Sequence, residues 1–466
     1  MEHVIIRDTA AVTVDPAIGV LRRADILVSD GVIVAIGPGL APPPDCTEID
    51  GTGRIAIPGL INAHTHLWQT AVRGMGLDWS GTEFHLHMQT HFVPALTPDD
   101  LRTAELVGAL NLLDSGTTSV LEWCHGARTL EHSLAAVDGL RGAGIRGVFA
   151  HGTVKTLPAP GQPHYSTLPH DPRVAAAVRE HLDGDDLLQM SLGVLGPDYA
   201  GIEVNRADFT LAADLDVMTT AHAHAPGKTD GAYQRLAQEG LLRTPHNLVH
   251  GTGFDDTQLR AVLEHGGSVT ATSMTEINGG PPEPVVGRVL DLGGRPSIGT
   301  DSEATTATDM FAAMRESLVI QRLFDALAHE HGTRPRPDRP RLDADRSARH
   351  EPTSADALRW ATLDNARALG IEHLVGSLTP GKQADIVLVR SDDLNTAPGL
   401  NPTDTVVALA HPGNVDTVLL GGKVLKHDGR LVSHTPGQVH EAMAALRATG
   451  ERLLAELDLE ELRSVG

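Results

Sequence analysis

The sequence has few cysteines, an excess of acidic over basic residues, and no long apolar run. Only two of its 466 residues are cysteines, Cys46 and Cys124, so a disulfide framework is excluded and a reducing, cytoplasmic compartment fits best. The N-terminal residues show no basic stretch followed by a long apolar one, so we expect no secretory signal. No segment reaches the ~18 uninterrupted apolar residues of a membrane span, so no membrane partner is expected.

Acidic residues outnumber basic ones. The chain has 37 Lys and Arg against 60 Asp and Glu, a formal net charge of −23. This charge repels polyanions, so nucleic acid is not an expected partner. Hydrophobic residues make up 41% and charged residues 21%, which is ordinary for a globular chain and argues against global disorder.

Two β-rich regions lie at opposite ends of the chain. Short runs in which Val and Ile alternate with polar residues fill the N-terminal region, and Gly, Asp and Pro separate them. The same pattern returns at 382–390, 404–411 and 415–432. We therefore expect strands from both termini to assemble one small β-sandwich.

The central region alternates strand-like and helical segments. TTSVLEW, IRGVFAHGTV, LLQMSLGVLG and DVMTTAHAHA are strand-like runs with helical segments between them, and the alternation continues to RPSIGTD. Roughly eight such repeats favour a closed (β/α)₈ TIM-like barrel over an open doubly wound sheet. The predicted α/β fold has a β-sandwich at 1–57 and 376–435, the barrel at 58–375 and a C-terminal helix at 436–466.

One segment, residues 331–351, is rich in Pro, Arg and Asp and cannot form a core. We expect a surface insertion. The alternative is a lid or a subunit contact, because the segment lies between barrel strand 8 and the final helix of the barrel.

Metal-ligand residue types recur at the ends of successive predicted strands. Alternate residues of a strand point to the same side, so the two histidines of an H-x-H pair can face the barrel axis together. Each such residue taken alone could be a satisfied core histidine or a helix N-cap. In a barrel, however, the carboxyl ends of the strands converge on one face. The residues concerned are His64, His66, His222, His224, His250 and Asp301.

Three imidazoles and one carboxylate suit a zinc-like ion that keeps a position open for water. A bound divalent ion lowers the pKa of water from near 16 toward neutrality and so makes hydroxide available. Asp301 is our candidate to take the proton of that water and pass it to the leaving group. His250 is the second catalytic candidate, placed to orient the water or polarise the substrate.

Several motifs together resemble the amidohydrolase superfamily, and more narrowly its cytosine-deaminase and chlorohydrolase-type branch with a mononuclear metal. They are PGLINAHTHLWQTAVRG, LLDSGTTSVLEW, AHAHA, LVHGTGFDD, SIGTDSEA and LVGSLTPGKQADIVLV, in the order of the family and over nearly the whole chain. The resemblance implies a hydrolase acting on non-peptide carbon–nitrogen bonds. It also implies one divalent metal, zinc before iron or manganese, and a homo-oligomer, a dimer or larger.

The resemblance assigns roles to individual residues. His64 and His66 match the strand-1 metal pair, His222 the strand-5 ligand, and Asp301 the strand-8 ligand and base. His250 matches the strand-6 histidine that contacts water or substrate. Binuclear members carry a carbamylated lysine after strand 4, which the run LLQMSLGVLGPD lacks, so a single metal is implied.

The sequence departs from the family where the substrate would lie. A glutamate three residues beyond the strand-5 histidine usually protonates the substrate ring, but this chain has Ala225 or, counted from His224, Gly227. Gly253 and Glu276 also stand where the family has other residues. The identity of the substrate therefore cannot be inferred from the resemblance to the family.

Other residues could line the substrate cavity. Trp68 and Gln69 directly follow the metal pair, and Glu122 ends predicted strand 2. His224 or Glu276 could supply the proton that the missing glutamate would give.

The leading hypothesis is the hydrolytic deamination of a small heterocyclic amine by metal-bound hydroxide. A second hydrolytic reading is the opening of a cyclic amide or amidine, or dechlorination. A hypothesis of another class is a catalytically silent homologue that binds a metal or ligand, suggested by the missing glutamate.

Overall fold

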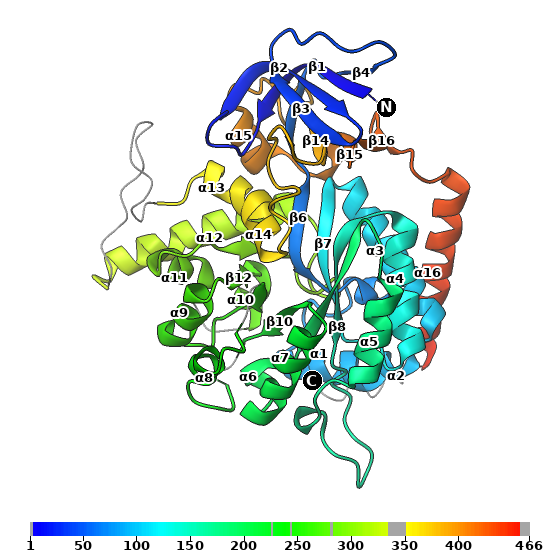
Figure 1. Ribbon diagram of the computed structural model, residues 1–466, viewed down its shortest axis with the longest axis vertical. Coiled ribbons are helices and arrows are strands. Elements are labelled where there is room, and N and C mark those ends of the chain that lie inside the picture. The colour runs from blue at the N-terminus through cyan, green and yellow to red at the C-terminus, as the bar shows by residue number, and fades with distance from the viewer. Residues whose placement is uncertain (1–2, 225–226, 243–244, 280–282, 334–350, 457–466) are drawn as a thin grey trace.

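The computed structural model describes residues 3–224, 227–242, 245–279, 283–333 and 351–456. These residues form two sheets, an eight-stranded parallel one and a nine-stranded mixed one. Figure 1 shows the parallel sheet surrounded by helices, with the mixed sheet beyond one end of it.

The parallel sheet is a barrel. Its strands pair in chain order with parallel register throughout. They are β6 (Leu60–Thr65), β7 (Thr117–Cys124), β8 (Arg146–Gly152), β9 (Leu188–Val194), β10 (Met218–His222), β11 (His246–Val249), β12 (Ser268–Ala271) and β13 (Ser297–Ile298). Almost every residue in them is buried, as expected when side chains fill the inside and helices cover the outside.

The first and last strands close the barrel. Beyond β13, the backbone N–H groups of Thr300 and Asp301 both donate to the carbonyl of His64 in β6, at 3.1 and 3.0 Å. The side chain of Asn62 adds a hydrogen bond to Thr300 Oγ1 at 2.7 Å. Closure therefore places the residues that follow β13 directly beside the end of β6.

Helices follow the strands and cover the barrel. The main ones are α3 (Pro98–Asp114), α4 (Leu130–Ala143), α5 (Pro172–His181), α7 (Ile202–Asp214), α8 (Ala232–Gln238), α9 (Asp256–Glu264), α11 (Val285–Asp291) and α12 (Met310–Glu330). Local signals set their ends: Thr97 and Asp100 form a capping box around Pro98 at the start of α3. The predicted (β/α)₈ barrel is confirmed.

Short helical turns connect these elements. Before α3 come η1 (Leu67–Val72), α1 (Gly81–His85), η2 (Leu86–Phe92) and α2 (Val93–Ala95). Farther along are η3 (Tyr165–Thr167), α6 (Gly196–Tyr199), α10 (Ser273–Gly279), α13 (Ser354–Arg359), η4 (Trp360–Asp364), α14 (Asn365–Ala368), α15 (Pro402–Asp404), η5 (Thr405–Leu409) and η6 (Pro412–Asn414).

The mixed sheet draws its strands from both ends of the chain, as predicted. They are β1 (His3–Val12), β2 (Val20–Ser29), β3 (Val32–Gly37), β4 (Thr47–Asp50), β5 (Arg54–Pro58), β14 (Ile386–Arg390), β15 (Val415–Leu420), β16 (Lys423–His427) and β17 (Arg430–Leu431). β5 and β14 pair antiparallel and join the two halves. The predicted boundaries at residues 57, 375 and 435 stay a proposal.

The chain passes from the mixed sheet to the barrel at a single glycine. β5 ends at Pro58 and β6 begins at Leu60, so RIAIPGLINAHTHL is two strands in different sheets. A Cβ at Gly59 would lie 2.1 Å from Thr118 Oγ1. Only glycine allows the backbone to approach β7 this closely at the turn.

The prediction of a strand at 404–411 is wrong. Residues 404–409 are helical, in the end of α15 and in η5, and residues 410–411 belong to no helix or strand. The side chain of Asn401 accepts a hydrogen bond from the Asp404 N–H, and Pro402 occupies the first helical turn. This local start signal outweighs the strand propensity of the valines that follow.

The predicted C-terminal helix is present as α16 (Pro436–Glu456). It lies along α3 on the outside of the barrel (Figure 1), where Thr449 Oγ1 donates to Asp100 Oδ1 at 2.7 Å. Most of the predicted insertion at 331–351, residues 334–350, lies outside the described residues, and so do residues 457–466.

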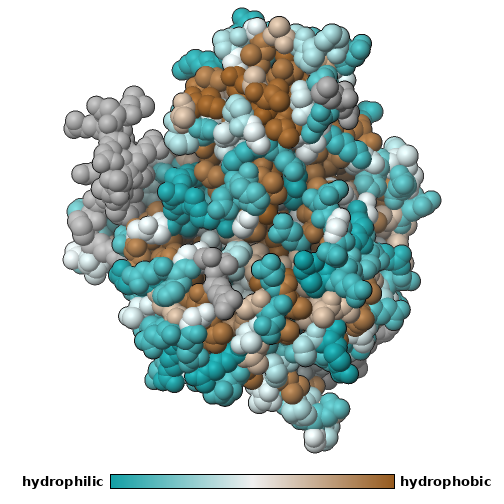
Figure 2. Space-filling model, viewed as in Figure 1, coloured by the Kyte–Doolittle hydropathy of each residue, from teal (hydrophilic) through white to brown (hydrophobic). Residues whose placement is uncertain are grey.

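The barrel and the mixed sheet differ in the hydropathy of their surfaces. In Figure 2, hydrophilic residues cover much of the visible barrel surface, whereas apolar residues gather over the mixed sheet. None of the described helices is long and apolar enough to cross a membrane.

Candidate metal centre and active site

Side chains from four strand ends meet at the carboxyl end of the barrel. His64 lies in β6, His222 ends β10, His250 directly follows β11 and Asp301 follows β13. Each offers one donor atom, and the four atoms lie within 4.8 Å of one another. All four residues are buried. Parallel strands bring their carboxyl ends to one face of a barrel, so residues distant in sequence converge there.

His66 approaches the same carboxylate. Its Nε2 lies 3.3 Å from Asp301 Oδ1, and Nε2 of His64 lies 3.1 Å from that oxygen. The other ring nitrogen of His66, Nδ1, donates to the carbonyl of Trp123 at 2.8 Å. In the neutral ring Nε2 then carries only a lone pair, and it faces a carboxylate oxygen that also only accepts. Two such atoms this close call for a cation between them.

The donor set fits a divalent metal ion. Nδ1 of His64 and Nε2 of His250 are buried and have no hydrogen-bond partner in the described part of the chain. Burial lowers the pKa of His64 to about 3 and that of His250 to about 4, and it lowers the pKa of His222 well below its usual range. Neutral imidazoles are the form that binds metal.

Asp301 is held as a carboxylate in a strained backbone. Burial alone would raise the pKa of Asp301, but the close approach of the His64 and His66 rings keeps it well below its usual range. The φ angle of Asp301 is 62° and that of His250 is 69°. Non-glycine residues in this left-handed region are uncommon and cluster at functional sites.

A second layer of contacts orients His250. Its Nδ1 lies 2.9 Å from Thr272 Oγ1 and 3.7 Å from Glu276 Oε1. The same Glu276 oxygen accepts the backbone N–H of Thr272 at 2.7 Å. Burial raises the pKa of Glu276 to about 8, so this carboxyl group is protonated at neutral pH. Contacts to Nδ1 leave Nε2 of His250 for the centre.

His224 lies on the open side of the centre. Its ring stacks on that of His250 with 3.7 Å between the centroids, and its side chain is exposed. Its backbone N–H donates to Asp198 Oδ2 at 2.9 Å. Ala225, where the family has its glutamate, lies outside the described residues.

Two other predicted substrate residues, Trp68 and Gln69, lie beside the metal-ligand group. Trp68 is buried in η1, with its ring 5.1 Å from that of His125. Gln69 accepts a hydrogen bond from the hydroxyl of Ser302, next to Asp301 in the chain. Both side chains therefore contact residues that neighbour the metal-ligand group.

Glu122 lies behind η1. Its Oε2 accepts the N–H of Leu67 at 2.6 Å, and Glu105 is its neighbour. Burial raises the pKa of Glu122 to about 8 and raises that of Glu105 as well. This carboxyl pair therefore supports the backbone next to His66.

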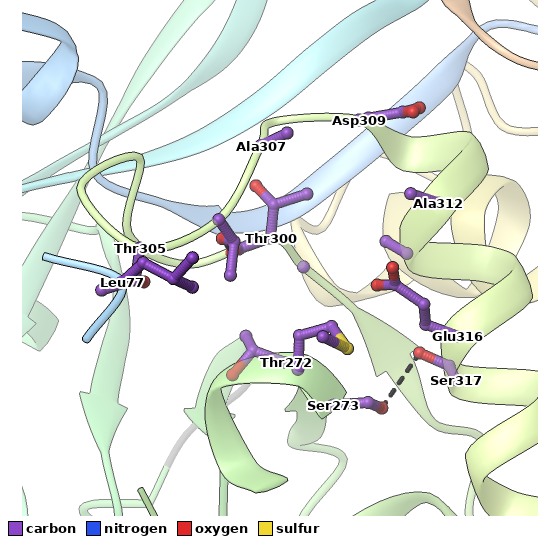
Figure 3. A pocket seen from close by; sticks show the side chains of 14 residues that line it. Leu77, Thr272, Ser273, Thr300, Thr305, Ala307, Asp309, Ala312, Glu316 and Ser317 are labelled. Atoms are coloured by element: carbon purple, nitrogen blue, oxygen red, sulfur yellow. Dashed lines mark hydrogen bonds between the residues drawn. The ribbon is translucent and has the colours of Figure 1, made fainter. Parts of the chain in front are cut away.

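A cavity of about 160 Å³ lies beside the centre. Figure 3 shows Thr272 and Thr300 from the strand ends on one side of it, and Glu316 and Ser317 of α12 on another. Thr272 also contacts His250, so the cavity adjoins the histidine group without containing it.

Sequence reasoning missed several neighbours of the centre. His125 directly follows β7 and its ring lies 4.5 Å from that of His66; the strand-end argument used for the other histidines would have found it. The ring of Trp123 lies 3.9 Å from that of His222. Lys155 follows β8 and is buried, but no sequence spacing marks its position.

The chain belongs to the amidohydrolase family. A family model of that description matches residues 55–425, which include the barrel and much of the mixed sheet. The prediction of an amidohydrolase-type hydrolase acting on carbon–nitrogen bonds is thereby confirmed.

Known relatives are similar over nearly their whole length. A 5'-deoxyadenosine deaminase of Methanothermobacter thermautotrophicus is 28% identical, covering 89% of this chain and 91% of the relative. An 8-oxoguanine deaminase of Pseudomonas aeruginosa is 27% identical, covering 88% and 91%. An adenosine deaminase from Xanthomonas campestris with bound zinc is structurally similar, with a TM-score of 0.78 and 22% identity over 97% of this chain and 98% of that one.

Proposed function

We propose that this chain catalyses the hydrolytic deamination of a small heterocyclic amine in a reaction that needs one divalent metal. Zinc is the first candidate for that metal. The observation that carries the proposal is the convergence of His64, His222, His250 and Asp301 at the mouth of the barrel. The similar relatives named as deaminases of 5'-deoxyadenosine and 8-oxoguanine support this reaction class.

The proposed ligands are His64, His66, His222 and Asp301, and His250 lies close enough to join them. When bound, the ion lowers the pKa of a coordinated water and supplies a nucleophile at neutral pH. The lone pairs that face Asp301 and the unpartnered nitrogens of His64 and His250 support this assignment.

Asp301 is the proposed proton acceptor. It is ionised because the neighbouring His64 and His66 rings keep its pKa low, and its carboxylate lies within the ligand group. A carboxylate beside an attacking water can take a proton and deliver it to a departing amine, a contribution of about 10²- to 10⁴-fold in rate.

His250 and His224 are the proposed substrate-facing groups. Thr272 and Glu276 lie next to Nδ1 of His250, so the other ring nitrogen, Nε2, can orient water or the substrate. His224 is stacked on His250 and exposed to the mouth. Its pKa is lowered to about 3, mainly by desolvation, so its ring is neutral and its proposed role is to donate a hydrogen bond to the substrate. Glu276 acts in this proposal by positioning His250.

The test pairs a substrate screen with one variant. Aminated and chlorinated purines, pyrimidines and triazines are incubated with the zinc-loaded protein, and ammonia and chloride are measured. We expect ammonia, and we expect Asp301→Asn to lower kcat by at least about 10³-fold with an unchanged circular dichroism spectrum. Asp183→Asn, an exposed aspartate of the surface, is the matched control.

The other outcomes separate the alternatives. Chloride release indicates dechlorination, and a ring-opened acid that retains all its nitrogen indicates hydrolysis of a cyclic amide. Full activity of Asp301→Asn would overturn the proposed role of that residue. A zinc-loaded protein that turns over none of the compounds would favour the catalytically silent homologue.

A further inference from the structure

One buried lysine at the barrel mouth takes no part in the reaction described above. Lys155 follows β8 by three residues and is only 6% exposed. Its ammonium lies 3.6 Å from the centroid of the Tyr199 ring. Its backbone N–H donates to Gln89 Oε1 at 3.2 Å, which ties the lysine to the helical turns after β6. The position of Lys155 is therefore set by two separate parts of the chain.

The ammonium and the neighbouring phenol both lack a hydrogen-bond partner among the described residues. Within the described part of the chain, Lys155 Nζ makes no hydrogen bond and lies within 4.0 Å of no carboxylate, and the Tyr199 hydroxyl makes no hydrogen bond. Burial raises the pKa of Tyr199, so its hydroxyl keeps its proton at neutral pH. Two adjacent groups thus offer donors that the described chain leaves unused.

This pair belongs to the same mouth as the metal-ligand group. Burial is the main reason that the pKa values of His222 and His224 are lowered, and the charge of Lys155 lowers both further; Asp198 and Asp301 in turn raise the pKa of Lys155 against its burial. Asp301 contacts two histidines, and Asp198 accepts the backbone N–H of His224. Neither carboxylate is therefore free to pair with the lysine alone.

A buried ammonium beside a cation site is unfavourable without a compensating anion. Removing a charge from water costs several kcal/mol unless it is paired, and a bound divalent ion adds like-charge repulsion. Burial lowers the pKa of Lys155 only to about 8, so the group is still charged at neutral pH. A ligand with one negative charge would satisfy both the ammonium and the phenol.

We propose that Lys155 and Tyr199 form an anion subsite, and that the substrate is a heterocyclic amine carrying a carboxylate. One ammonium and one hydroxyl match the single charge and two oxygens of a carboxylate, whereas a phosphate would call for more donors. This inference rests on the proposed function for the reaction, but the subsite itself is tested by binding.

The experiment compares two product-like rings that differ by one carboxylate. Deamination leaves an oxo group on the ring, so orotate and uracil serve as probes for isothermal titration calorimetry with the zinc-loaded protein. We expect orotate to bind about 10- to 100-fold more tightly than uracil. Lys155→Met should abolish this preference and leave the affinity for uracil unchanged. Tyr199→Phe should weaken orotate binding only.

The controls separate the subsite from the fold and from the reaction. Lys423→Met, at an exposed lysine of β16, should behave as wild type, and zinc content and circular dichroism should be the same in all variants. Equal affinity for the two probes, no binding of orotate at millimolar concentration, or a preference that persists in Lys155→Met would overturn the proposal. Orotate preference without ammonia release from any amine would leave the subsite intact and contradict deamination instead.

Discussion

At the scale of single residues, Glu122 links the site to the pH dependence of stability. Burial raises its pKa from 4.5 to about 8, so the folded chain holds a proton that the unfolded chain releases. A raised pKa contributes stability that is complete below pH 4.5 and is lost as pH rises toward 8. The neighbouring carboxyl of Glu105 adds to this effect, because its pKa is raised as well.

Glu122→Gln should therefore flatten the decline in stability with pH. The wild type should lose on the order of 2 kcal/mol more than the variant between pH 5 and pH 8, measured by urea unfolding at each pH. Glutamine still accepts a hydrogen bond from the Leu67 N–H, so the variant should fold. Glu131→Gln, at an exposed position of α4, should follow the wild type. Parallel curves for Glu122→Gln and wild type would contradict the assignment.

At the scale of elements, Asn365 joins the first and last strands of the barrel from outside. This first residue of α14 is fully buried. Its Nδ2 donates to the carbonyls of Ile61 in β6 and Ile298 in β13, and its Oδ1 accepts the Ile298 N–H at 2.8 Å. β13 has only two residues, so this side chain replaces much of the ladder that such a short strand lacks.

Asn365→Leu should lower the free energy of unfolding by about 2–5 kcal/mol, because it leaves buried backbone groups without partners. Denaturant unfolding followed by fluorescence measures the loss. Asn395→Leu removes hydrogen bonds from an exposed asparagine and should cost much less. Equal losses in the two variants would mean that burial does not set the cost.

At the scale of the whole molecule, the metal should couple the strands that it touches. An ion that binds only the folded chain stabilises it by about 4 kcal/mol at a thousandfold excess over its dissociation constant. Removal of zinc by a chelator should therefore lower the thermal midpoint, and added zinc should restore it. His222→Ala should show a smaller zinc response. An identical midpoint with and without zinc would contradict a metal centre at this position.

The predicted homo-oligomer stays a prediction.

Much of the fold and of the centre was visible in the sequence because both depend on local patterns. Apolar runs alternating with helical segments determined the barrel, and the positions of His64, His66, His222, His250 and Asp301 at strand ends determined the candidate centre. The order of the strands in a parallel barrel follows the chain, so strand ends converge wherever such a barrel forms.

Tertiary structure alone decided which of these groups face the centre. Glu122 and His125 lie within a few residues of one another, yet Glu122 is turned toward Leu67 and His125 toward His66. The Lys155 ammonium, which has no hydrogen-bond partner among the described residues, and the helical turn at Thr405–Leu409 were likewise not predicted. Orientation and the absence of a partner depend on contacts between distant segments, and the spacing of residues along one strand does not encode those contacts.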